Sequence, residues 1–496
     1  MSHWLSDEEL RETAPAETAA FRGPIPTQVV SNGEYMPSPQ TDDQRRVERI
    51  LGELADAHAR RLRMDRRQFL KTSCGMAAAF VAMNRVYGEL FSVGVAEAAE
   101  PAAAAERLAA LAKQLVIDVQ LHFVRDDFSW DGLLMLGEWA KRWNPVLERE
   151  GVTLRRYKFE NFVKEVFLDS ETRVGLISGA PSDDPAHSVI GSAELARARD
   201  TLNAVAGSRR MLSHSILRPG QSGWLDEIDR ALAEWKPDSW KGYTVGDPLA
   251  PSQFPWRMDD EKVTYPGYAK IAKSGTRIVC VHKGLLPADY ETSTKHWRYA
   301  MVDDVGKAAK DWPQLTFVIY HSGLKPFLTP PDESLAQFEK SGRMDWVTDL
   351  AEIPAKYGVS NVYAELGTSF ASSAVTHPRH CAALLGTLIR GMGVDHVLWG
   401  TDSVWYGSPQ WQIEAFRRIE IPEEMQKKHR FAPLGAADGA TKSAILAGNA
   451  ARLYGLDLAA LSQASERDSL AEAKREYEAA GPDRSNVAYG FIRRAA

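Results

Sequence analysis

The sequence predicts an α/β protein built as a (β/α)₈ TIM barrel, and two observations lead to this prediction. Short apolar runs alternate with longer helical patterns through most of the chain, which is typical of βαβ units around a parallel sheet. Eight such runs follow one another, and most are separated by enough residues for a helix. The predicted strands are 115–124, 173–180, 211–217, 242–246, 277–284, 315–323, 361–367 and 396–402.

Four regions are expected along the chain. Residues 1–62 are polar, and the segment 11–43 is rich in Ala, Pro, Thr and Ser, so we expect a disordered N-terminal extension. Residues 63–100 form a signal-like region, and residues 110–457 form the barrel with irregular insertions, among them the proline-containing stretch 247–268. Residues 458–496 are charged and Ala-rich, which predicts a helical tail packed outside the barrel.

Composition excludes several classes of protein. With 44% hydrophobic and 25% charged residues the chain can bury a large core. A net charge of -6 offers no basic surface for nucleic acid, so we expect no nucleic-acid partner. The three cysteines, Cys74, Cys280 and Cys381, have no paired spacing, which argues against disulfides and thiolate metal sites.

The region 63–100 has the order of an export signal, namely charge, apolar run and small residues. Residues 65–71 read DRRQFLK and are followed by the apolar CGMAAAFVAM at 74–83. This resembles the twin-arginine translocation signal, with Arg66 and Arg67 as the arginine pair. The resemblance implies export to the periplasm or beyond and contact with the twin-arginine translocation machinery. The alternative interpretation is an amphipathic helix that begins near Asp65.

Four polar residues lie at the carboxyl ends of predicted strands. His122 ends the first, His282 the fifth, His321 the sixth and Asp402 the eighth. Barrel enzymes place reactive residues at this face, so the four side chains are expected to converge. Three imidazoles and a carboxylate suit Zn²⁺, Fe²⁺ or Mn²⁺ with one coordination position left open for catalysis.

The motifs at these strand ends are similar to those of the amidohydrolase-related family. They are Asp-x-x-x-His at 118–122, HSG at 321–323, GTDSVW at 400–405 and GNAARLYGL at 448–456. The family includes aminocarboxymuconate-semialdehyde decarboxylase, resorcylate-type decarboxylases, and hydrolases of lactones and amides. The resemblance covers roughly residues 115–457 and implies a barrel of the metal-dependent hydrolase type.

The resemblance also implies roles for individual residues. His122 and His282 match metal ligands, Asp402 matches a carboxylate that binds metal and handles protons, and His321 matches the histidine that polarises substrate or activates water. One divalent metal ion is expected, with zinc first and manganese or iron as the alternatives.

Gln120 departs from the family pattern, which has His-x-His at the end of the first strand. Alternate residues of a strand share a face, so Gln120 is expected to point into the barrel with His122. Three outcomes are open. Gln120 ligates the metal through oxygen, the site takes a harder ion such as Mn²⁺ or Fe²⁺, or the metal is lost.

Further candidates would contact the substrate. Arg218 and Lys283 follow strand ends and could bind a substrate carboxylate. Glu365, near the end of the seventh strand, could hold a cation or add an oxygen ligand, and Trp405 would suit an aromatic ring. Each of these residues has an ordinary structural alternative, as a surface charge, a paired carboxylate or a packing residue.

The leading hypothesis is hydrolysis of a small cyclic or acyl substrate by metal-activated water. The alternatives are metal-dependent non-oxidative decarboxylation of an aromatic or unsaturated acid, and a metal-free barrel that binds a partner. Redox chemistry at iron or manganese is more remote. We expect a small-molecule substrate and a homo-oligomer, as a dimer.

Overall fold

Eight parallel strands form the expected barrel in this computed structural model, which describes residues 5, 7–123, 159–184, 188, 190–248, 252–285, 296–325 and 331–494. Each strand pairs with the next one in sequence. The barrel closes where Leu121 bridges Ser403 and the Asp402 amide donates to the Gln120 carbonyl at 2.9 Å. The (β/α)₈ prediction is therefore confirmed. The barrel strands are β2 (Ile117–Leu121), β3 (Val174–Ile177), β4 (Met211–Ile216), β5 (Ser239–Tyr243), β6 (Ile278–His282), β7 (Thr316–Tyr320), β8 (Val362–Glu365) and β9 (Val397–Leu398).

One strand boundary differs from the prediction. β5 begins at Ser239, whereas the sequence placed this strand at 242–246. Lys241 interrupts the apolar pattern, but it is buried in the sheet, as is Trp240. The barrel interior accepts Lys241 because its ammonium lies 3.4 Å from the centroid of the Tyr320 ring. All other predicted ranges contain their strands.

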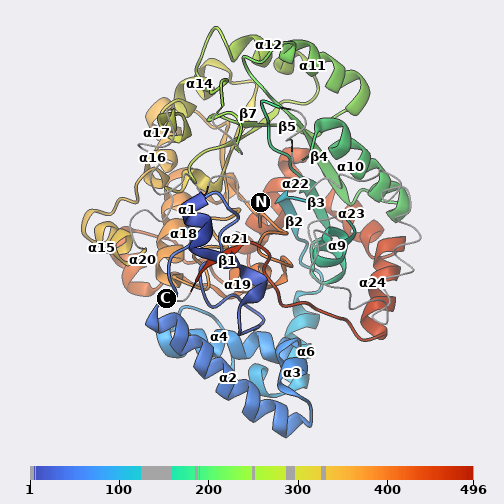
Figure 1. Cartoon of the computed structure of the whole chain (residues 1–496), viewed down its shortest axis with the longest axis vertical. Helices are drawn as coiled ribbons and strands as arrows, with labels where there is room; N and C mark the ends of the chain where they lie inside the picture. Colours follow the sequence, from blue (N-terminus) through green and yellow to red (C-terminus); the bar gives the residue numbers. More distant parts are fainter. Residues whose placement is uncertain are drawn as a thin grey trace.

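Helices follow the strands and cover the outside of the barrel (Figure 1). The end of the barrel where the strands begin is covered by α22. There the Tyr454 hydroxyl lies 3.8 Å from the Cys280 sulfur and 3.5 Å from Ser239 Oγ. The helices between β2 and α22 are α9 (Phe159–Val163), α10 (Ser192–Ala206), α11 (Trp224–Arg230), α12 (Tyr265–Lys273), α14 (Val305–Asp311), α15 (Pro331–Ser341), α16 (Val347–Ala351), α17 (Ile353–Tyr357), α18 (Pro378–Met392), α19 (Gln410–Arg418), α20 (Glu423–His429), α21 (Ala440–Ser443) and α22 (Asn449–Tyr454).

The N-terminal region is folded, so the prediction of a disordered extension at 1–62 is wrong for the residues that the structure describes. α2 (Asp42–Leu62) starts with a capping box, in which Thr41 and Gln44 exchange side-chain to backbone hydrogen bonds. Val47, Leu51 and Ala55 recur at helical spacing and are buried. In Figure 1, α2 lies at one end of the molecule beside α3 (Arg66–Leu70), α4 (Ser73–Tyr87) and α6 (Pro101–Leu111). α5 (Val95–Ala99) packs against α4 and α6, whereas α1 (Asp7–Arg11) lies apart from these helices.

The signal-like residues belong to this N-terminal layer. Asp65 caps α3 through a capping box with Gln68, which agrees with the alternative interpretation of a helix that begins near Asp65. Arg66 and Arg67 are exposed, whereas α4 buries the apolar run from Ala77 to Met83. No helix among the described residues is long and apolar enough to cross a membrane. Export stays a prediction.

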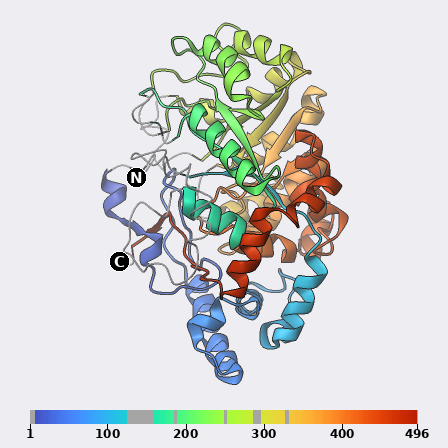
Figure 2. The ribbon, with the colours of Figure 1, turned by 90° about the vertical axis from the view of Figure 1, so that its right-hand side faces the viewer.

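The two ends of the chain meet beside the barrel. β1 (Thr13–Pro15) pairs antiparallel with β10 (Phe491–Arg493), and Ser31 forms a further bridge to Phe491. Figure 2 shows both termini on the same side of the molecule. The predicted helical tail is right for α23 (Leu458–Ser465) and α24 (Ser469–Ala479) but wrong beyond them, because the chain becomes extended to reach β1.

Candidate active site

The four residues that the sequence singled out gather at one mouth of the barrel. His122 follows β2, His282 ends β6, His321 follows β7, and Asp402 follows β9. All four are buried, with exposures of 8%, 3%, 1% and 1%. These are the carboxyl ends of the strands, where barrel enzymes assemble their reactive groups.

Asp402 accepts hydrogen bonds from four side chains. Its Oδ1 accepts from His122 Nε2 at 2.9 Å and from Gln120 Nε2 at 3.1 Å. Its Oδ2 accepts from Asn32 Nδ2 at 3.2 Å and from the Thr368 hydroxyl. Burial favours the neutral acid, but His122, His321 and Thr368 together outweigh it through hydrogen bonds and charge, and the pKa of Asp402 lies below its usual value. The carboxylate is therefore ionised at neutral pH.

His321 presents a nitrogen lone pair to the mouth. Its Nδ1 lies 2.9 Å from the Gly367 carbonyl, which can only accept, so Nδ1 carries the proton. Burial lowers the pKa of His321 to about 4, which keeps the ring neutral and leaves the Nε2 lone pair available. Gln120 Nε2 lies 3.3 Å from that atom. A neutral imidazole with its second nitrogen fixed by a carbonyl is the usual state of a histidine metal ligand.

Glu365 supports the loop that carries His321. It accepts the His321 amide at 3.1 Å and the Gly367 amide at 2.5 Å, and its side chain is fully buried. Burial raises the pKa of Glu365 to about 8. His321 itself has a positive φ of 63°, a strained conformation that these contacts hold in place. Glu365 therefore positions His321, whereas the sequence predicted a substrate contact.

His282 is buried between aromatic rings and has an unsatisfied nitrogen. Its ring stacks on Tyr243 with centroids 4.3 Å apart and meets His321 edge to face at 4.5 Å. Burial holds the pKa of His282 well below its usual value, so the ring is neutral. Its Nδ1 has no hydrogen-bond partner among the residues that the structure describes. Buried polar atoms almost always have a hydrogen-bond partner, so the lack of one at this nitrogen needs an explanation.

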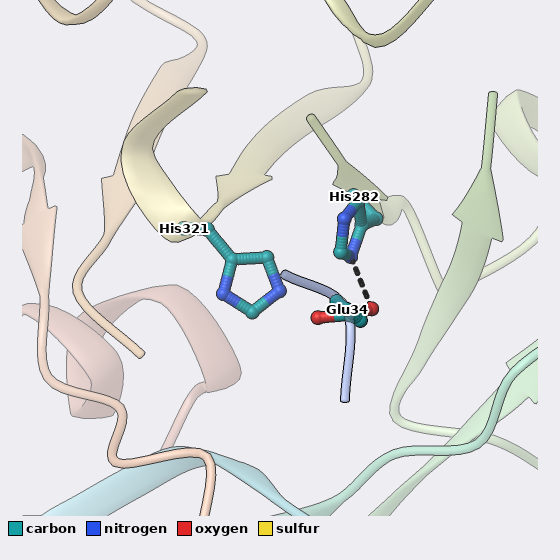
Figure 3. A group of neighbouring side chains, drawn as sticks. All are labelled: Glu34, His282 and His321. Carbon is teal, nitrogen blue, oxygen red and sulfur yellow. Dashed lines mark ion pairs between the residues drawn. The ribbon is translucent and has the colours of Figure 1, made fainter. Parts of the chain in front are cut away.

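Glu34 completes this group and was not expected from the sequence. Its Oε1 lies 3.7 Å from His282 Nδ1. A dashed line joins the two side chains in Figure 3. One potential ligand atom each from Glu34, His282 and His321 lies within 4.8 Å of the others. Two neutral imidazoles and a carboxylate are a donor set that zinc, iron and manganese accept. The side chains present therefore fit a divalent metal ion.

Lys241 was also missed by the sequence analysis. It is fully buried on β5, and its ammonium lacks a hydrogen-bond partner within the described part of the chain. Burial lowers the pKa of Lys241 to about 8. Because the predicted strand began at residue 242, the alternation that turns Ser239, Lys241 and Tyr243 to one face was lost.

Two predicted substrate-binding cations do not reach the mouth, and these predictions are wrong. Lys283 follows the inward-facing His282 and is buried against Asp304, with Nζ to carboxylate distances of 2.7 and 2.8 Å. Arg218 pairs with Glu227 of α11. Strand alternation explains Lys283, because the residue after an inward-facing one points outward.

Gln120 and Trp405 both lie at the mouth. The Gln120 amide nitrogen faces Asp402, because a carboxylate only accepts hydrogen bonds, and its oxygen has no partner among the described residues. Ligation of a metal ion through the Gln120 oxygen, one of the three outcomes that the sequence left open, stays a prediction. His122 likewise directs Nε2 at Asp402. Trp405 lies beside His122, with ring centroids 6.3 Å apart, and its contact with a substrate stays a prediction.

The cavity at the mouth is small. It measures about 30 Å³ and is lined by Asn32, Glu34, His122, Gly179, Ala180, Tyr243, Pro248, His321, Asp402 and Trp405. That volume holds an ion and a water molecule, whereas pockets for drug-sized ligands measure about 300–1,000 Å³. A larger cavity of about 590 Å³ lies elsewhere, between the N-terminal layer and α24, and none of the three histidines lines it.

Comparison with known proteins supports an amidohydrolase-related family. Residues 225–456 match the family model described as Amidohydrolase, a span that includes His282, His321 and Asp402 but not Glu34 or Gln120. The search of curated proteins found no match.

The chain is also similar to solved structures at low sequence identity. An uncharacterized TIM-barrel protein from Bordetella bronchiseptica is 13% identical with a TM-score of 0.42, covering 70% of this chain and 99% of its own. A 2,6-dihydroxybenzoate decarboxylase from Rhizobium is 14% identical with a TM-score of 0.39, covering 69% and 99%. An amidohydrolase from Burkholderia multivorans is 16% identical with a TM-score of 0.40, covering 69% and 100%.

Proposed function

We propose that this chain is a metal-dependent enzyme related to the amidohydrolases, and that it hydrolyses a small cyclic or acyl substrate. The observation that carries the proposal is the unsatisfied Nδ1 of His282, buried beside the Nε2 lone pair of His321 at the mouth of the barrel. His282 and His321 would hold the ion together with a carboxylate. A divalent ion bound there would polarise a substrate carbonyl and lower the pKa of water.

The charges around the mouth favour a cation. Asp402 is ionised, Glu34 is a second buried carboxyl group, and both histidines are neutral. Lys241 is a buried cation close to these groups, and burial lowers its pKa. Buried negative charge is costly unless it is paired, so a divalent ion would stabilise this arrangement.

The chain's own residues supply the remaining steps. Asp402 and His122, joined at 2.9 Å, form a pair that can accept a proton from an attacking water and return it to a leaving group. Gln120 and Thr368 hold the Asp402 carboxylate in place. Trp405 and Tyr243 line the cavity and exclude water from one side of it.

The positions of the predicted cations bear on the second candidate function, decarboxylation. Decarboxylation of an aromatic acid would be helped by a cation that binds the substrate carboxylate at the mouth. Arg218 and Lys283, which the sequence offered for that role, are paired with Glu227 and Asp304 instead. Decarboxylation remains the second candidate.

An assay of both reactions tests the proposal. Protein stripped by a chelator and reloaded with Zn²⁺, Mn²⁺ or Fe²⁺ is offered lactones, esters and amides with acid release as readout, and hydroxybenzoates with CO₂ release as readout. We expect metal-dependent acid release. CO₂ release alone would assign the decarboxylase function, and a metal-loaded protein inactive in both assays would contradict hydrolysis of the substrates offered.

We also propose that the protein is exported through the twin-arginine route. The arginine pair at residues 66 and 67 is exposed at the start of α3, where a receptor could contact it. Fractionation of cells that express the wild type and the double variant Arg66→Lys, Arg67→Lys tests this. We expect the wild type outside the cytoplasm and the variant retained inside, and equal distribution of the two would contradict export by this route.

A further inference from the structure

We propose that Glu34 is a ligand of the metal ion, and that the N-terminal arm (residues 30–35) completes the active site by carrying this carboxylate into the barrel mouth. The inference rests on the proposed function, because it assigns a donor to the same metal site. Glu34 lies outside residues 225–456, the span that matches the amidohydrolase model.

The position of Glu34 is that of a ligand. Its side chain is 5% exposed, and its Oε1 lies 3.7 Å from the unsatisfied Nδ1 of His282. That separation is too long for a hydrogen bond. It is suited to two donors on one ion, because ligands about 2 Å from a shared zinc ion lie about 3–4 Å apart. Figure 3 shows the carboxylate of Glu34 and the two imidazoles turned toward the same space.

Without an ion, Glu34 and His282 are two buried polar groups that make no hydrogen bond to each other. Burial disfavours the charged form of both groups. A cation between the carboxylate and the neutral imidazole would satisfy both groups at once, whereas a direct ion pair would require both to be charged in this buried site.

The arm is built to hold Glu34 at this point. Gly33 has a positive φ of 99°, which permits the tight turn, and the Glu34 amide donates to Asn32 Oδ1 at 3.1 Å. The Asn32 amide donates to Glu34 Oε2 at 2.5 Å and to Asp402 Oδ2 at 3.2 Å. Asn32 thus links the arm to the Asp402 carboxylate, and it orients the Glu34 carboxylate.

The C-terminal strand anchors the arm. Ser31 and Phe491 exchange two backbone hydrogen bonds of 2.8 Å each. Gly490 allows this close approach, because a Cβ there would lie 2.0 Å from the Ser31 carbonyl oxygen. The Tyr35 hydroxyl donates to the Val30 carbonyl at 2.7 Å and closes the turn. Both ends of the chain therefore contribute to one metal site inside the barrel.

Cobalt binding tests the assignment without relying on turnover. Metal-free wild type, Glu34→Gln, Glu34→Asp and the control Glu53→Gln are titrated with Co²⁺, and the visible absorption and the affinity are recorded. Glu53 lies on the exposed side of α2 and is 62% exposed. We expect the affinity of Glu34→Gln to fall by about 100-fold or more, because losing even a hydrogen-bonding partner of a ligand costs about 10–100-fold. Its cobalt spectrum should change as well.

The variants separate the possible results. Glu34→Asp keeps a carboxylate and should lose less affinity than Glu34→Gln, while Glu53→Gln should match the wild type. Equal affinity and an unchanged spectrum in Glu34→Gln would overturn the role of Glu34 and leave the metal enzyme intact. Unchanged metal binding with faster turnover would identify the arm as an inhibitory plug and also overturn it. A wild type that binds no cobalt would instead contradict the proposed function itself.

Discussion

His282→Ala is expected to lower the rate of the metal-dependent reaction by about 1,000-fold or more, which corresponds to about 4 kcal/mol of lost transition-state stabilisation. The substitution removes an imidazole that no protein group replaces, because His282 Nδ1 has no partner among the described residues. The ring also stacks on Tyr243 and meets His321 edge to face, so its removal leaves a cavity at the centre of the site. Steady-state kinetics on metal-loaded protein measures the effect.

A matched variant separates this effect from general damage. His396→Ala makes the same change just before β9, at the end of the barrel opposite the mouth, where His396 contacts the Ser360 carbonyl at 2.9 Å. We expect the rate of that variant to stay within a few-fold of wild type. A His282→Ala protein that is folded, metal-loaded and as active as His396→Ala would show that His282 does not hold the ion.

Asp402→Asn is expected to lower the rate by a similar factor for a different reason. The carboxylate accepts from His122, Gln120, Asn32 and Thr368, and an amide in its place would direct an NH₂ group at two of these donors. The variant loses the proton acceptor and leaves buried donors unsatisfied. The free energy of unfolding should therefore fall by about 1–3 kcal/mol in addition to the loss of rate.

Kinetics and denaturant unfolding of Asp402→Asn should be compared with those of Asp395→Asn. Asp395 is 58% exposed, and the same replacement there is expected to leave the rate unchanged. Wild-type turnover in Asp402→Asn would exclude the Asp402–His122 pair as the proton acceptor, even if the protein proved less stable.

The barrel was predictable because burial imposes a simple pattern on its strands. Ile278–His282 ends in a histidine and Thr316–Tyr320 is followed by one, so the boundaries of these largely apolar runs and the reactive residue are visible together. Convergence of His122, His282, His321 and Asp402 follows from the parallel arrangement alone. β5 was placed late because Lys241 breaks the apolar run, and only the tertiary contact with Tyr320 explains its burial.

The part of the site that contains Glu34 depends on contacts between segments that are far apart in the chain. Such contacts cannot be read from the sequence. Residues 30–35 have no helical or strand periodicity, and they are fixed by Phe491 and by Asp402, far along the chain. Glu34 therefore looked like part of a polar extension. α2, in contrast, carried a readable signal in its capping box and in the spacing of Val47, Leu51 and Ala55, which the composition of the preceding residues obscured.

The hydrogen bonds of Asp402 could not be predicted from the sequence either. Strand alternation correctly placed Gln120 in the barrel, but which amide atom faces the mouth depends on the neighbouring carboxylate. In the same way, Arg218 and Lys283 follow strand ends and looked suited to an anionic substrate. Their partners, Glu227 and Asp304, lie on or next to helices whose packing sets the pairing.

The metal content of the purified wild-type protein tests the central claim most directly. Plasma mass spectrometry after reloading with Zn²⁺, Mn²⁺ or Fe²⁺ and removal of excess ion gives the number of equivalents bound. The account predicts about one equivalent, held by His282, His321 and a carboxylate. A folded wild-type protein that retains none of these ions would contradict the account and would point to a barrel that binds a partner without catalysis.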